Sequence, residues 1–120
     1  LGLSLVANGI EWKAGDEIIC YHDDYPANVY PWAGCEARGV VVKRLKPLVL
    51  GRIDIADLEP LLTPRTRLVA LASCHYLSGI RLPVDEIGRF LHSKNILFCL
   101  DAIQTLGAVP TSTEHVDFLA

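Results

Sequence analysis

Short apolar runs alternate along this chain with segments that have helical patterns, and this alternation strongly restricts the folds open to it. The apolar runs comprise residues 17–21, 39–43, 67–72 and 96–100. The helical segments comprise residues 3–10, 28–37, 54–62 and 83–94. Nearly continuous apolar strands separated by helices are typical of a parallel sheet that is covered on both faces. We therefore predict an α/β fold, with a mainly parallel sheet flanked by helices.

Residues at the ends of the helical segments agree with this prediction. Asp54 is suited to cap the helix that follows it, and Pro60 is expected to shorten or bend that helix. Pro83 fits the first turn of the next helix, and Lys94 suits its negative end. Residues 43–51 are predicted to form an exposed connection.

Composition and charge narrow the classes of protein that this chain can represent. At 120 residues and 51% hydrophobic content, the chain is predicted to form at most one domain, residues 1–120. A net charge of −3 gives no reason to expect nucleic acid or an anionic membrane as a partner. No apolar stretch approaches the roughly 20 residues of a membrane span. Because the chain begins with Leu1 and ends on an apolar run, we expect that it is truncated at both ends.

The four cysteines are too far apart for a CxxC motif, so a zinc site is not expected. Cys20 and Cys99 lie inside apolar runs and are interpreted as core thiols of a protein from a reducing compartment, the cytoplasm. Asp23 and Asp24 form a short acidic pair, which we interpret as part of a solvated loop. No further spacing of ligands follows them, so metal binding is not expected there.

The last apolar run, residues 96–100, ends in a carboxylate, Asp101, and Gln104 follows three residues later. In a parallel sheet, such an acid lies at the C-terminal edge, where α/β proteins bind ligands. An acid with a nearby amide suits a flat heteroaromatic ring, since the acid can pair with a protonated ring nitrogen and the amide can bond a ring oxygen. Pyridoxal phosphate is held in this way. Asp101 is equally suited to cap the next helix, and the spacing alone leaves both interpretations open.

Four stretches resemble, in order and spacing, the class V aminotransferase family. They comprise residues 2–7 with 12–19, residues 24–32, residues 73–79 with 82–87, and residues 101–110 with 116–118. This family belongs to the fold-type I pyridoxal-phosphate enzymes, with the cysteine desulfurases, selenocysteine lyases and isopenicillin N epimerase-like proteins. The resemblance implies part of the large cofactor domain of a homodimeric enzyme acting on an amino acid. Transamination, lyase, desulfurase and epimerase chemistry are all compatible with it.

The resemblance also implies roles for individual residues. Asp101 would keep the cofactor ring nitrogen protonated, Gln104 and His75 would hold the ring oxygen, and Tyr25 would stack on the ring. His75 could also move a proton. Gly2 and the amides of the first helix would form part of the phosphate site. Cysteine desulfurases usually have histidine at the position of Tyr25, and tyrosine is a poor base near neutral pH. We therefore expect weak desulfurase activity.

Simpler interpretations exist for two of these residues. Tyr25 precedes a proline and is also compatible with an ordinary turn. His75 follows an apolar run in a loop that closes at Gly79, and a solvated loop histidine is the alternative there.

Two residues that the family needs are not found at the matching positions. The Schiff-base lysine of the family lies beyond the stretch that resembles residues 116–120, and its phosphate-binding threonine would precede Leu1. None of the lysines present matches the family lysine: Lys13, Lys43, Lys46 and Lys94. We therefore expect the 120-residue chain alone to be inactive. The alternative is a non-enzymatic α/β domain that binds a ligand or a partner. A Rossmann-like nucleotide binder is disfavoured because no G-x-G-x-x-G motif follows a strand.

Overall fold

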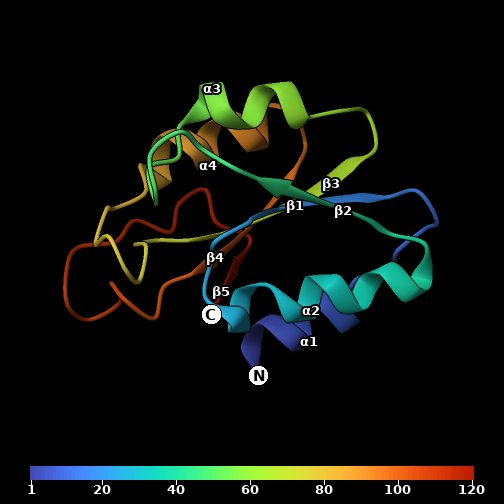
Figure 1. Ribbon diagram of the computed structural model, residues 1–120, viewed down its shortest axis with the longest axis horizontal. Coiled ribbons are helices and arrows are strands. Elements are labelled where there is room, and N and C mark those ends of the chain that lie inside the picture. Colours follow the sequence, from blue (N-terminus) through green and yellow to red (C-terminus); the bar gives the residue numbers. More distant parts are fainter.

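The computed structural model describes all 120 residues. Five strands form one sheet in the order β2-β1-β3-β4-β5 (Figure 1). Their bounds are Glu17–Tyr21 (β1), Val41–Leu45 (β2), Thr66–Ala72 (β3), Leu97–Asp101 (β4) and Phe118–Leu119 (β5). All four pairings between neighbouring strands are parallel. The predicted α/β fold with a parallel sheet is therefore confirmed.

Helices cover both faces of this sheet: α1 and α2 lie on one side, and α3 and α4 lie on the other (Figure 1). Their bounds are Gly2–Gly9 (α1), Tyr30–Ala33 (α2), Ile55–Leu58 (α3) and Val84–Ser93 (α4). Three 3₁₀ helices accompany them, at Pro26–Asn28, Gly34–Arg38 and Glu59–Leu61. None of the helices combines the length and apolar character that a membrane crossing needs.

Because helices cover both faces of the sheet, the strands form nearly continuous apolar runs in the sequence. Every residue of β1 is buried. Ile19 and Tyr21 belong to the hydrophobic cluster under α3 and α4, whereas Ile18 and Cys20 belong to the cluster under α1 and α2. Because successive side chains of a strand point to opposite faces, the interior of a strand covered on both faces is apolar. Glu17, at the start of β1, is the charged exception.

Two predicted helices are shorter than expected. The predicted helix over residues 28–37 is broken into α2 and two flanking 3₁₀ helices. Pro31 lies inside the predicted helix, where its missing N–H would remove a hydrogen bond, and it is accommodated in the first turn of α2 instead. The helix predicted from Asp54 does begin there, and Asp54 and Asp57 form a reciprocal capping box. It changes to a 3₁₀ helix at Glu59, next to Pro60, as expected.

The second strand begins later than predicted, at Val41, because Gly39 adopts a left-handed conformation (φ 80°) that ends the preceding 3₁₀ helix. Residues 43–45 belong to β2 and Gly51 is buried, so the exposed connection covers only residues 46–50. The strand β5 was not predicted, since two residues give no apolar pattern. Its pairing with β4 is supported by Asp117, whose carboxylate accepts a hydrogen bond from the Phe98 N–H at 2.8 Å.

A polar cluster joins the N-terminal ends of three strands. One carboxylate oxygen of Glu17 (β1) accepts hydrogen bonds from Lys43 Nζ (β2) at 2.7 Å, Thr63 Oγ1 at 2.7 Å and Thr66 Oγ1 (β3) at 3.0 Å. Lys43 Nζ also donates to the Leu61 carbonyl at 2.8 Å. Burial by itself raises the pKa of Glu17, but the hydrogen bonds from Lys43 and the two threonines outweigh it, and the pKa is lowered.

This cluster makes the stability of the chain dependent on pH. A carboxyl group with a lowered pKa stabilises the fold above its unfolded pKa of about 4.3, and the contribution is lost as the pH falls through its folded pKa. We expect Glu17→Gln to lower the unfolding free energy by about 1–3 kcal/mol at pH 7 and by less in acid. Urea unfolding at pH 7 and below pH 4 measures this. The exposed Glu11→Gln is the control, and an equal deficit for Glu17→Gln at both pH values would contradict the prediction.

Candidate functional site

A cavity opens at the C-terminal edge of the sheet, where the loops after β1 and β3 meet the end of β4. Its volume is about 370 Å³, within the usual range for small-ligand sites. The lining residues are Asp24, Tyr25, Ala72, Cys74, Tyr76, Asp101, Ile103 and Gln104. The parallel pairing of β3 with β4 places Ala72 opposite Asp101, so the loops that follow these strands diverge around the cavity.

Asp101 is the last residue of β4 and is only 8% exposed. One of its carboxylate oxygens accepts a hydrogen bond from the Ile103 N–H at 3.1 Å, and the other has no protein partner. The segment that follows is a series of turns and not a helix. The interpretation of Asp101 as a helix cap is therefore wrong, because its carboxylate supports a turn and not a helix. Asp101 also lines the cavity, and its role toward a cofactor stays a prediction.

Gln104 lies on this turn and lines the same cavity as Asp101. The turn is fixed to β3 by its next residue, since the Thr105 and Ser73 hydroxyls are 2.7 Å apart and both are buried. The Ser73 N–H also donates to the Asp101 carbonyl at 2.8 Å. Sequence reasoning did not identify this support, which joins residues that lie far apart in the chain.

Two tyrosines form an aromatic wall of the cavity. Tyr25 is 54% exposed and precedes the 3₁₀ helix that begins at Pro26, so the Tyr-Pro turn is also present. Its ring packs edge to face against Tyr76, with the ring centroids 5.4 Å apart. Tyr76 lies in the loop after β3, and sequence reasoning passed over it in favour of its neighbour His75.

The structure does not bring His75 to the lining of this cavity. The side chain is 4% exposed, and both of its ring nitrogens have protein partners. Nε2 lies 3.2 Å from the Asp23 carbonyl, and Nδ1 accepts a hydrogen bond from the Ser78 N–H at 3.2 Å. The Ser78 hydroxyl also lies 3.0 Å from Nδ1. His75 thus joins the loop after β1 to the loop after β3, and it is not the solvated loop histidine of the alternative interpretation.

Gly2 lies at the same edge of the sheet, also outside the lining of the cavity. A Cβ atom at Gly2 would be 3.1 Å from the Cβ of Ala120, which follows β5. The Ala120 carbonyl in turn accepts a hydrogen bond from the Ala102 N–H at 2.7 Å, directly after Asp101. Gly2 at the N-terminus of α1 therefore lies close to Ala120, which is hydrogen-bonded to the residue that follows Asp101.

Asp24 corrects the prediction of a solvated acidic pair. Asp23 is exposed, but Asp24 is only 7% exposed and lines the cavity. Burial raises the pKa of Asp24, and the nearby charge of Asp101 raises it further. Hydrogen bonds from the Tyr25 N–H and from Asn28, together with the charge of His75, oppose this shift. Sequence reasoning missed Asp24 because its burial depends on segments from β1, β3 and β4 that meet only in the fold.

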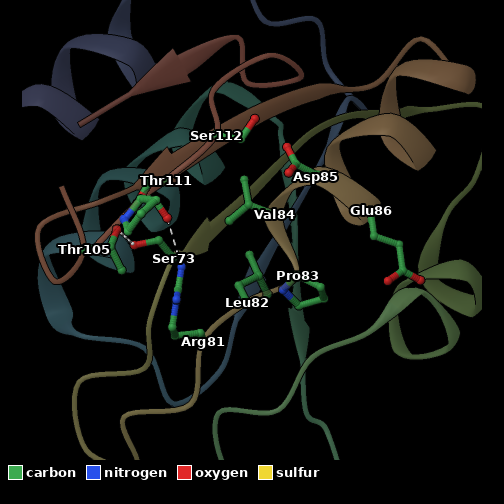
Figure 2. Close-up of a pocket in the computed structure, with 11 residues that line it drawn as sticks. Ser73, Arg81, Leu82, Pro83, Val84, Asp85, Glu86, Thr105, Thr111 and Ser112 are labelled. Carbon is green, nitrogen blue, oxygen red and sulfur yellow. Dashed lines mark hydrogen bonds between the residues drawn. The ribbon is translucent and has the colours of Figure 1, made fainter. Parts of the chain in front are cut away.

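A second cavity, of about 330 Å³, lies between the end of β3, the start of α4 and residues 105–112 (Figure 2). Ser73 and Thr105 line it, and the hydrogen bond between them is drawn in Figure 2. Arg81 also lines this cavity, but its guanidinium already donates to the Pro110 carbonyl at 3.0 Å. The largely buried carboxylates of Asp24 and Asp101 and the two tyrosine rings line the first cavity. We therefore assign the candidate site to that cavity.

The cysteines give a simple test of access to this cavity. Cys20, Cys35 and Cys99 are fully buried, and burial raises the pKa of Cys20 to about 11 and that of Cys99 to about 12. Cys74 is partly exposed and lines the cavity. We expect Cys74 alone of these thiols to react rapidly with a disulfide reagent in the folded state, because the thiolate is the reactive form.

Mass spectrometry of the four cysteine peptides after brief labelling identifies the modified thiol. Cys74→Ser should remove the rapid reaction, Cys35→Ser should retain it, and denaturation should expose all four cysteines. Rapid labelling of Cys20 or Cys99 in the folded protein would contradict the packing described above.

Comparison with known proteins gives the family. The family model for aminotransferase class-V matches residues 2–120. A probable cysteine desulfurase from Chlamydia muridarum (strain MoPn / Nigg) is 32% identical over 123 residues, which cover 100% of this chain and 31% of that protein. The mitochondrial cysteine desulfurase of Drosophila melanogaster is 40% identical over 75 residues, which cover 62% of this chain and 16% of that protein.

Solved structures show the same fold. The apo structure of a cysteine desulfurase from Thermococcus onnurineus NA1 matches 98% of this chain and 30% of that chain, with a TM-score of 0.89 and 26% identity. The cystine C-S lyase C-DES, in complex with its product cysteine persulfide, matches 99% of this chain and 34% of that chain, with a TM-score of 0.86 and 26% identity. The present chain thus spans about a third of the length of these proteins. Since the family model covers residues 2–120, the chain belongs to the class V aminotransferases, a family of pyridoxal-phosphate-dependent enzymes that act on amino acids.

Proposed function

We propose that this chain is the cofactor-binding core of a pyridoxal-phosphate-dependent enzyme that acts on an amino acid. The observation that carries the proposal is Asp101, a near-buried carboxylate at the C-terminal end of β4 that faces a cavity with Gln104 and Tyr25. A carboxylate with one oxygen free of protein partners, an amide and an aromatic ring are the groups that a pyridine ring with a phenolic oxygen requires. Membership of the class V family supports the same conclusion.

Each residue of the cavity has a distinct proposed role. Asp101 holds a proton on the ring nitrogen, Gln104 donates to the ring oxygen, and Tyr25 covers one face of the ring. When bound, pyridoxal phosphate supplies an electron sink for the carbanion that forms on the amino acid. Gly2 and the N–H groups at the start of α1 are proposed to contact the phosphate, since a helix N-terminus favours an anion. Their connection to Ala102 through Ala120 supports this role.

For His75 we propose a positioning role. Its ring nitrogens hold Asp23 and Ser78, and its ring lies 5.1 Å from that of Tyr76. It would thereby fix the loops that carry Tyr25 and Tyr76 around the cofactor. The contact with the ring oxygen is then left to Gln104, which lines the cavity.

We also propose the oligomeric state, the cellular location and the substrate class of the enzyme. Homodimer formation and a cytoplasmic location follow from the family resemblance. All four cysteines are free, as expected for a reducing compartment. The substrate class is an amino acid, and the chemistry is transamination, lyase, desulfurase or epimerase chemistry.

The proposal is tested with the protein expressed from its complete reading frame. Titration with pyridoxal phosphate should produce a saturable change in visible absorbance, and incubation with single amino acids should yield a keto acid, sulfide or an inverted stereocentre. Absence of saturable cofactor binding would favour the non-enzymatic α/β domain.

The Tyr25 ring gives a prediction about the reaction type. If Tyr25 only covers the cofactor ring, Tyr25→Phe should keep most of the activity. Tyr25→Ala should weaken cofactor binding by about 0.5–1.5 kcal/mol, the energy of an aromatic stacking contact. Cysteine should be a poor desulfuration substrate, because tyrosine does not replace a histidine in proton transfer near neutral pH. Rapid release of sulfide from cysteine that is lost in Tyr25→Phe would show that the Tyr25 hydroxyl takes part in the chemistry.

A further inference from the structure

The cavity holds a second near-buried carboxylate besides Asp101. Asp24 comes from the loop after β1, on the opposite side of β3 from Asp101, and is 7% exposed. The lining contains these two carboxylates and no lysine or arginine. Two carboxylates without a cation between them repel each other, and in a largely buried site this repulsion is weakly screened. A cationic group in the cavity would relieve it.

Asp24 is held rigidly by a chain of buried hydrogen bonds. Its Oδ1 accepts from the Tyr25 N–H at 2.8 Å, and its Oδ2 accepts from Asn28 Nδ2 at 2.8 Å. The Asn28 Oδ1 then accepts from Trp32 Nε1 at 3.0 Å. Asn28 and Trp32 are fully buried, and Trp32 belongs to the hydrophobic cluster that includes α1. Asp24 therefore presents a fixed charge to the cavity and also fixes the backbone of Tyr25.

His75 is the group near Asp24 that can carry a positive charge, and its charge lowers the pKa of Asp24. Asp101 faces it from β4, and the phenol of Tyr25 and the thiol of Cys74 line the same cavity. Tyr76 completes the aromatic wall. His75, from the loop after β3, lies outside the lining, and both of its ring nitrogens have protein partners. Within the lining itself, a compensating positive charge would therefore come from the ligand.

We propose that Asp24 is a positioning residue that acts together with Asp101 to favour a cationic ring nitrogen in the bound cofactor, while it holds Tyr25 against the ring. This inference rests on the proposed function, because it concerns the same cavity. It adds that two carboxylates give the cavity its preference for a protonated pyridine ring: Asp101 at the end of β4 and Asp24 in the loop after β1.

The test compares two cofactor forms with two variants in the complete protein. The cofactors are pyridoxal phosphate and its isostere in which carbon replaces the ring nitrogen, so that the ring cannot carry the charge. The variants are Asp24→Asn, which keeps the shape of the side chain, and the control Asp23→Asn, which removes an exposed charge from the adjacent residue. Dissociation constants are measured by absorbance or fluorescence titration.

We expect Asp24→Asn to weaken pyridoxal phosphate binding about tenfold, which corresponds to one pKa unit of interaction. The carbon isostere should lose much less affinity in Asp24→Asn, because it loses only the support that the second acceptor oxygen gives to Tyr25 and Asn28. Asp23→Asn should leave both affinities unchanged. Equal weakening of both cofactors in Asp24→Asn would overturn the proposal, because it would mean that Asp24 only supports the backbone of Tyr25.

A measurement on the parent protein covers the case in which Asp24→Asn does not fold. Carboxyl-carbon NMR can follow the titration of Asp24 with and without cofactor. A cationic ring should move the Asp24 titration to lower pH, whereas the isostere should not. An unchanged titration with pyridoxal phosphate bound would overturn the proposal. Failure of the parent protein to bind any pyridoxal phosphate would instead refute the proposed function, so the two failures are distinguishable.

Discussion

Replacement of Asp101 by alanine is expected to lower the kcat/KM of the complete enzyme by about 100- to 1,000-fold. The carboxylate stabilises a charge on the cofactor ring that matters most as the carbanion forms, and removal of such a group commonly costs about 2.7–4 kcal/mol. Gln104→Ala should cost only about 0.5–1.5 kcal/mol, because Gln104 contributes a neutral hydrogen bond. Steady-state kinetics of the two variants measure the difference.

Asp101→Asn separates the charge from the local hydrogen bond. Asparagine can still accept from the Ile103 N–H, so the turn after β4 should be retained. We expect this variant to lose nearly as much activity as Asp101→Ala. Losses of equal size in Asp101→Ala and Gln104→Ala would contradict the roles assigned to the two residues.

The largest effect on stability is expected at Trp32. This side chain is fully buried between α1 and the sheet, and its indole N–H donates to Asn28. Trp32→Ala should lower the unfolding free energy by about 3–5 kcal/mol, because it removes the packing and leaves a cavity. Urea unfolding followed by circular dichroism measures the change.

Trp32→Phe is the matched variant. It retains most of the apolar volume but leaves the Asn28 Oδ1 buried without its donor, which should cost about 1–3 kcal/mol. It should also loosen Asp24, which is bonded to the same Asn28. If Trp32→Ala and Trp32→Phe lowered stability equally, the main contribution of Trp32 would be the hydrogen bond and not its packing.

Much of the sheet could be predicted because its strands are buried on both faces. Residues 17–21 form β1 as predicted, and the apolar run 96–100 leads to an acid at the strand end, as expected for Asp101. The strand β5 could not be predicted in this way. Its pairing is set by contacts with β4, such as the hydrogen bond from Phe98 to Asp117, and not by a pattern of its own.

The residues of the site that could be predicted were those indicated by the end of a single strand or by the family resemblance. The strand end indicated Asp101 and Gln104, the resemblance added Tyr25, and all three line one cavity. The burial of Asp24 and the engagement of both His75 nitrogens depend on loops from different strands, so local sequence could not reveal them. The same holds for the support of the turn after β4, where Ser73 bonds Thr105 across 32 residues of sequence.

The most direct test of the central claim is a crystal structure of the complete protein grown with pyridoxal phosphate. The account predicts that the pyridine ring fills the cavity at the C-terminal edge of the sheet. Its nitrogen should lie within hydrogen-bond distance of the Asp101 carboxylate, and its face should lie against Tyr25. Pyridoxal phosphate bound elsewhere, or bound with its ring nitrogen turned away from Asp101, would contradict the account.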